Sequence, residues 1–246
     1  GNHKFFTVIL RDISERRRLE EQLHRTERIA ELGTVASGMA HEIGTPMNVI
    51  LGRAEVLMDS VTDESARKGL QVIIDEVGRI TRVMDQLLSF ARRRPPERRP
   101  IHLQDVIDSS LEMYSARVAQ GHVQVVRQVD AACPVVQADR DQMNQVLINL
   151  VMNAIQAMPD GGTLTIGLRP EKDMVRLTVG DTGHGIPQAL IEKIFQPFFT
   201  TKEVGKGTGL GLTVVKDIVD EHQGSITVES KEGKGTEFAV LLPVSR

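Results

Sequence analysis

Apolar residues in the first part of the chain follow the spacing of one face of an α-helix. Between about Ser14 and Arg94 they recur at steps of three and four. The first series comprises Leu32, Ala36, Met39, Ile43, Ile50, Ala54 and Leu57, and the second comprises Leu70, Ile73, Val77, Ile80, Met84, Leu87 and Ala91. The polar residues 58–69 between the two series include residue types that favour helix starts. The pattern predicts a hairpin of two long helices.

Each predicted helix carries only a narrow apolar stripe, which one hairpin cannot bury by itself. Pairing two hairpins in a four-helix bundle would cover both stripes, so we expect a homodimer. Before the hairpin, residues 1–13 contain a strand-like run, "KFFTVIL". Residues 14–30 continue the apolar stripe, so the first helix is expected to extend from about Ser14 to Met58.

The pattern changes after "RRRPPERRP", whose prolines and arginines cannot continue a helix and indicate a linker. Strand-like runs then alternate with helical ones. The strand-like runs are "VQVVRQV", "TLTIGL", "MVRLTVG", "SITVES" and "EFAVLLP". The helical runs are "LQDVIDSSLEMYSARV", "RDQMNQVLINLVMNAIQAM" and "GLTVVKDIVDEH". This alternation predicts an α/β layered domain over residues 101–246, so the fold class of the whole chain is α+β.

Composition excludes several classes of function. The net charge of −3 and an aromatic content of 3% argue against nucleic-acid binding. The single cysteine, Cys133, cannot form an internal disulfide and fits a reducing compartment. No apolar run is long enough to span a bilayer, and no signal peptide opens the sequence. We therefore expect a cytoplasmic location and no membrane segment in this stretch of chain.

Three motifs in the second part could bind a ligand, although each also has a purely structural interpretation. Asn149 and Asn153 are one helical turn apart and share a face, but backbone or water could satisfy two such amides. The segment "DTGHGIP" places Asp181 at the end of a predicted strand, with Gly183 and Gly185 allowing positive φ and close approach of a ligand. A plain turn would have the same sequence character.

The third motif, "GKGTGLGL", leads directly into a predicted helix. Glycine-rich turns at helix N-termini present free N–H groups and a positive dipole end, which favour phosphate. It matches neither a Walker loop nor a Rossmann turn. Between this motif and "DTGHGIP" lies "IFQPFFTTKEV", which is either a small apolar cluster under a loop or a hinged lid with aromatic anchors.

Taken in order, H-E-x-x-T-P, N-x-x-x-N, D-x-G-x-G-I, F-x-x-F-F and G-x-G-x-G-L-G-L resemble the sensor histidine kinases of two-component signalling. The resemblance covers residues 18–244 and implies the following division. Residues 1–13 resemble the last strand of a PAS sensor domain, and residues 14–30 a signalling helix. Residues 31–94 would be the dimerisation and histidine-phosphotransfer hairpin, residues 95–100 a linker, and residues 101–246 a two-layer ATP-binding domain of the Bergerat or GHKL type.

The resemblance also implies the reaction and its residues. His41 would receive the γ-phosphoryl group of ATP, Glu42 would take or orient its proton, and Thr45 would orient water for phosphatase activity. A response regulator receiver domain would then take the phosphoryl group on an aspartate. Magnesium would bind Asn153, supported by Asn149, and Asp181 would bind the adenine amino group. The remaining expected nucleotide contacts are Gly183, Gly185, Ile186, Phe195, Thr201, Lys202, Lys206, Gly207, Thr208, Gly209, Leu210 and Gly211.

Pro46 cannot donate a backbone hydrogen bond, so we expect the helix to kink just after His41. Two positions depart from the family's usual pattern. Gly44 stands where many relatives have a larger or charged residue, and Gln156 stands where a lysine often supports the phosphates. Lys202, Lys206 or Arg140 could supply the missing charge.

Two other functions stay open. One is a GHKL ATPase clamp, which needs a carboxylate where this chain has Asn149. The other is a catalytically silent dimeric scaffold.

Overall fold

The structure is a computed structural model that describes residues 42–91, 95–130, 132–202 and 207–245. It divides into two compact units, Gly1–Arg93 and Arg94–Arg246. The strand expected in residues 1–13, the helix expected in residues 14–41, and His41 itself lie outside the described residues. Within the described ranges, no helix has the length and hydropathy needed to cross a membrane.

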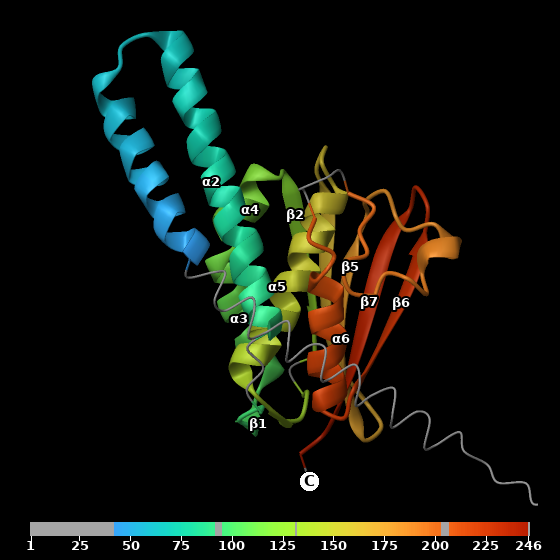
Figure 1. Cartoon of the computed structure of the whole chain (residues 1–246). Coiled ribbons are helices and arrows are strands. Elements are labelled where there is room, and N and C mark those ends of the chain that lie inside the picture. Colours follow the sequence, from blue (N-terminus) through green and yellow to red (C-terminus); the bar gives the residue numbers. More distant parts are fainter. Residues whose placement is uncertain (1–41, 92–94, 131, 203–206, 246) are drawn as a thin grey trace, which may run out of the picture. The chain divides into compact units, whose positions relative to one another are not determined.

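The first unit is the predicted helical hairpin (Figure 1). One helix occupies residues 42–60 and runs through Pro46, and α2 spans Glu64–Ala91. The Asp63 carboxylate accepts the Ala66 N–H at 2.8 Å, which caps the start of α2. Arg67 closes the turn by donating to the Met58 and Val61 carbonyls at 2.7 and 3.2 Å. The sequence signals for this turn are confirmed.

The second unit is a two-layer α/β domain. Among the described residues, five strands form a mixed sheet in the order β2-β4-β5-β7-β6. Their bounds are Val123–Val129, Gly162–Glu171, Met174–Asp181, Gly235–Pro243 and Ser225–Lys231, in that order. β2 and β4 are parallel, and the other neighbours are antiparallel. The five strands predicted from hydrophobic patterning are therefore present.

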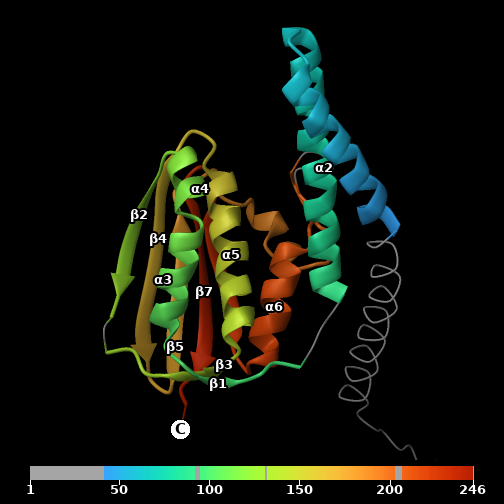
Figure 2. The same cartoon turned by 90° about the vertical axis from the view of Figure 1, so that its left-hand side faces the viewer.

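The helices α3 (Leu103–Met113), α4 (Ser115–Gln120), α5 (Arg140–Ala157) and α6 (Gly211–Glu221) cover one face of this sheet (Figure 2). The core lies between the two layers, where every second residue of the central strands is buried. These strand residues are Leu164, Ile166, Leu168, Val175, Leu177, Val179, Phe238, Val240 and Leu242. Val146, Leu147 and Leu150 of α5 are also fully buried. This apolar layer fixes α5 and α6 beside each other.

Two expectations about this unit are wrong in part. The expected linker, residues 95–100, ends inside β1 (Arg99–Ile101), which pairs antiparallel with β3 (Val136–Ala138). All of residues 95–100 belong to the second unit, and residues 99 and 100 are part of its strand β1. The run expected to be one helix over residues 103–118 is divided at Tyr114, whose φ and ψ of −103° and 9° end α3 before α4 begins.

Candidate functional site

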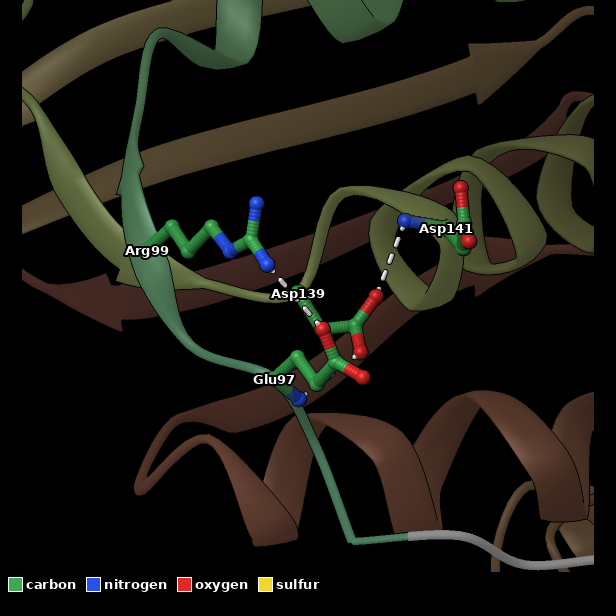
Figure 3. A network of polar contacts seen from close by, with 4 residues as sticks. All are labelled: Glu97, Arg99, Asp139 and Asp141. Carbon is green, nitrogen blue, oxygen red and sulfur yellow. Dashed lines mark hydrogen bonds and ion pairs between the residues drawn. The ribbon is translucent and has the colours of Figure 1, made fainter.

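The candidate site begins with α5, whose position depends on Asp139. One oxygen of the Asp139 carboxylate accepts the N–H groups of Asp141 and Gln142 at 3.0 and 3.2 Å, which caps the helix. The other oxygen accepts the N–H of Glu97 at 2.9 Å (Figure 3). Asp139 is buried, so these bonds offset the cost of removing its carboxylate from water. The start of α5 is thereby fastened to the segment that leads into β1.

His222 completes this arrangement from the end of α6. Its Nε2 accepts the backbone N–H of Asp139 at 3.0 Å, and its Nδ1 lies 2.8 Å from the Ile218 carbonyl oxygen. An acceptor at Nε2 and a donor at Nδ1 define one neutral tautomer of the ring. His222 is buried, with 2% of its surface exposed. It therefore joins the N-terminus of α5 to the C-terminus of α6.

Asn149 lies against the glycine-rich start of α6. A Cβ atom added to Gly211 would be 3.3 Å from Asn149 Oδ1. Gly211 is the first residue of α6, and the N-cap residue Leu210 has no side-chain cap hydrogen bond. The N-cap side chain therefore leaves the first N–H groups of α6 unbonded, and free N–H groups at a helix start favour anion binding. The structure therefore brings the first of the two asparagines close to the glycine-rich motif.

The rest of the glycine-rich motif packs on residues 195–200, which contain three phenylalanines and are called the phenylalanine segment here. Gly209 has a φ of +66°, and an added Cβ atom would be 2.3 Å from the backbone carbon of Phe198. Gly207 is also close to Thr200, whose Oγ1 would be 2.6 Å from such an atom. Thr213 of α6 donates its hydroxyl to the Phe195 carbonyl at 3.1 Å. The two segments are thus one packed element in the described part of the chain.

Asp181 ends β5, and its Oδ1 accepts the Gly183 N–H at 2.8 Å. Burial raises the pKa of Asp181 above its ordinary value, and hydrogen bonds from Gly183 and Thr236 and the charge of His184 oppose this rise. The carboxylate has a fixed direction because a backbone donor holds it. Such an oriented acceptor suits a ligand amino group.

The glycines near Asp181 serve close approach of the chain to itself. An added Cβ atom at Gly183 would be 2.3 Å from the Ala157 carbonyl oxygen, and one at Gly185 would be 2.2 Å from that of Lys231. Gly185 has a φ of +70°, whereas Gly183 is not among the positive-φ glycines, so that part of the expectation is wrong. Sequence reasoning missed Gly235, which has a φ of +103° and lies against the Asp181 carbonyl. Three backbone segments therefore meet at the end of β5.

Lys202 reaches the face of α5 that carries Asn153. Its Nζ donates to Asn153 Oδ1 at 3.1 Å and also to Gln156 Oε1. Burial lowers the pKa of Lys202 below its ordinary value. Of the three cations considered for the position of Gln156, Lys202 is the one whose contacts place it there. Lys206 lies outside the described residues, and Arg140 begins α5, roughly 20 Å from Asn153 at about 1.5 Å per residue.

The other predicted residues have simpler surroundings. Ile186 is half-buried and donates its N–H to Ser230 Oγ at 2.7 Å. Thr208 Oγ1 lies 3.5 Å from the Leu210 nitrogen, and Thr201 is exposed. On the hairpin, Glu42 and Thr45 are exposed. These two side chains are accessible to a reaction partner.

The oxygen of Asn153 is chemically suited to bind a magnesium ion. The Asn153 oxygen already accepts a hydrogen bond from a cation, the Lys202 ammonium. Among the described residues, no group of three His, Cys, Asp or Glu side chains could hold a metal. Magnesium commonly takes few protein oxygens and completes its octahedron with water and phosphate. A single amide oxygen, that of Asn153, is consistent with this coordination.

A mixed sheet covered by helices on one face, with a paired-asparagine helix beside a glycine-rich helix start, defines a GHKL-type nucleotide-binding domain behind a helical hairpin. Residues 138–246 match the family of histidine kinase-, DNA gyrase B-, and HSP90-like ATPases, which makes ATP the nucleotide of the domain's family. Residues 31–96 match the His Kinase A (phospho-acceptor) domain. The chain belongs to the sensor histidine kinases of two-component signalling.

Individual relatives agree with this assignment. The chain is 35% identical over 238 residues to sporulation kinase E of Bacillus subtilis (strain 168), covering 96% of this chain and 32% of that protein. It is 34% identical over 239 residues to the signal transduction histidine-protein kinase AtoS of Escherichia coli (strain K12), covering 97% and 39%. The chain thus spans about a third to a half of the length of the curated relatives it matches.

One solved structure is similar to nearly the whole chain. It is the histidine kinase ThkA in complex with the response regulator protein TrrA, with a TM-score of 0.67 and 31% identity. The match covers 96% of this chain and 68% of that one.

Proposed function

We propose that this chain uses ATP to phosphorylate His41 and passes the phosphoryl group to an aspartate of a response regulator receiver domain. The observation that carries the proposal is the contact between Asn149 of α5 and Gly211 at the start of α6. It sets an amide beside the start of α6, whose N-cap side chain makes no capping bond, and free N–H groups at a helix start favour phosphate. The match of residues 31–96 to the His Kinase A (phospho-acceptor) domain supports His41 as the acceptor.

The candidate site residues of the second unit then bind different parts of the nucleotide. Asp181 accepts a hydrogen bond from the adenine amino group, and Gly183 holds the carboxylate in place. The N–H groups from Gly207 to Gly211 bind the phosphates. Asn153, supported by Asn149, holds magnesium. Bound magnesium supplies positive charge that stabilises the transferring phosphoryl group.

The transfer itself takes place at the hairpin. A ring nitrogen of neutral His41 forms a bond to the γ-phosphorus while the bond from phosphorus to the bridging oxygen breaks, which releases ADP. Glu42 takes or orients the proton that the imidazole loses. Thr45, which is exposed one turn further along, orients water for the reverse task of dephosphorylating the regulator.

We also propose that the hairpin forms a homodimer. Ile50, Leu57 and Ile73, which belong to the predicted apolar stripes, have 41%, 49% and 44% of their surface exposed in the single chain. A second copy would cover them in a four-helix bundle. The complex of ThkA with a response regulator supports a receiver domain as the second partner. A PAS-like sensor domain upstream would supply the signal.

The decisive experiment incubates the protein with magnesium and γ-labelled ATP and tests the stability of the protein-bound label. Wild type should carry a label that acid removes and alkali preserves, as expected for phosphohistidine. His41→Gln and Asn153→Ala should carry none. Steady phosphate release that survives His41→Gln would indicate a GHKL ATPase instead. Failure of the wild type to bind ATP would indicate a silent scaffold.

A further inference from the structure

Lys202 places a positive charge on the oxygen to which the proposed function assigns magnesium. Its Nζ lies 3.1 Å from Asn153 Oδ1 and also donates to Gln156 Oε1. Asn153 and Gln156 are three residues apart on α5 and therefore share a face of the helix. Both acceptors are neutral amides, so neither of them balances the charge of the ammonium. An anion that arrives here gains an interaction that these amides do not provide.

An ammonium and a magnesium ion cannot both use this oxygen comfortably. Magnesium binds oxygen at about 2.1 Å. With the ammonium at 3.1 Å from the same atom, the two cations could be no more than about 5 Å apart. At such a distance within a half-buried site their repulsion is strong. Occupation of Asn153 by one therefore disfavours the other.

We propose that Lys202 and magnesium compete for Asn153 Oδ1. Without nucleotide, the Lys202 ammonium occupies the position of magnesium on Asn153, and Gln156 is the positioning residue that holds the ammonium there. When nucleotide and magnesium bind, Lys202 leaves Asn153 and pairs with phosphate oxygens. Lys202 thereby supplies from the loop after the phenylalanine segment the charge that position 156 lacks. This inference rests on the proposed assignment of magnesium to Asn153.

The test measures how strongly magnesium improves nucleotide binding. The dissociation constant of the non-hydrolysable analogue AMPPNP is determined by calorimetry once in EDTA and once in saturating magnesium. The constant in EDTA divided by the constant in magnesium is the magnesium ratio, and this ratio is compared between variants. Lys202→Met should raise this ratio about three- to tenfold. The variant lacks the ammonium that competes with magnesium for Asn153, and it also lacks the charge that would pair with the phosphates when magnesium is absent. Gln156→Leu should raise the ratio less, because the ammonium loses only its second anchor.

The matched control is Lys216→Met, since Lys216 is another lysine with a side-chain partner, Asp220 at 3.6 Å, and lies on α6. It should leave the ratio as in wild type. An unchanged or lower ratio in Lys202→Met would overturn the competition. Asn153→Ala separates the two proposals, because it should bring the ratio close to one. If Asn153→Ala keeps the wild-type ratio, the magnesium assignment itself is wrong. Thermal unfolding of each variant checks folding, and Lys202→Gln replaces Lys202→Met if the latter does not fold.

Discussion

Asp139 offers the sharpest test of how the site is held, because its carboxylate accepts three backbone N–H groups. Asp139→Ala removes the cap of α5, which costs about 1 kcal/mol. It also removes the bond from Glu97, and a hydrogen bond to a charged group contributes about 1.5–3 kcal/mol. We take the lower end for this bond because Glu97 is exposed. The expected loss in the free energy of unfolding is therefore about 2–3 kcal/mol.

Calorimetric unfolding of the whole chain measures this loss. For a domain of this size about 1 kcal/mol lowers the midpoint by roughly 2–4 °C, so the transition of the second unit should fall by roughly 4–12 °C. Asp139→Asn keeps one oxygen acceptor and should lose less. Asp105→Ala, an exposed acid in the first turn of α3, is the matched control and should change stability by no more than about 0.5 kcal/mol. An Asp139→Ala transition at the wild-type temperature would refute the reasoning.

Three further predictions concern the site and the hairpin. Gly183→Ala should lower the free energy of unfolding by about 1–3 kcal/mol and weaken AMPPNP binding at least about tenfold. Gly69→Ala, with open space around it in α2, should raise that free energy by up to about 1 kcal/mol and leave binding unchanged. Equal effects of the two changes would contradict the packing argument. Because the pKa of Asp181 is raised in the folded state, the contribution of Asp181 to stability should decline as the pH rises from the ordinary pKa of 3.8 through the raised pKa. Urea unfolding of Asp181→Asn at a series of pH values should lack this decline, and a pH profile parallel to that of wild type would contradict the prediction. Ile73→Glu should convert a dimer into a monomer in light scattering while changing the hairpin's helix content little, and a persistent dimer would exclude that face.

Hydrophobic periodicity was sufficient for the longer elements of the fold. Five strands and the helices around them follow from alternation at two residues or at three and four, because each buries one face against the other layer. The two short strands were missed for a physical reason. β1 and β3 have three residues each, and their pairing joins Arg99 with Ala138 across a long stretch of sequence. Local patterning contains no information about such a contact.

The candidate site was predictable in its motifs but not in its contacts. Asparagine spacing and glycine content identified α5 and the start of α6, yet the neighbour of Gly183 is a carbonyl of α5 that no motif reveals. The choice of Lys202 as the cation beside Gln156 likewise required the fold. One missed residue did have a signal: Asp139 immediately precedes a helical pattern, and aspartate is a favoured N-cap residue. His222 had none, since its role depends on a partner 83 residues away.

The bonds of Glu97 and Arg98 bear on where the second unit can be cut from the rest of the chain. A truncated protein that begins at Ile101 would lose two of the three residues of β1, the Glu97 donor to Asp139, and the bond from Arg98 to the Glu221 carbonyl at the end of α6. β3 would then be left almost without a partner. A protein that begins before Glu97 keeps all of these interactions. The independently folding unit should therefore start within the proline-rich segment, several residues ahead of the first strong hydrophobic pattern.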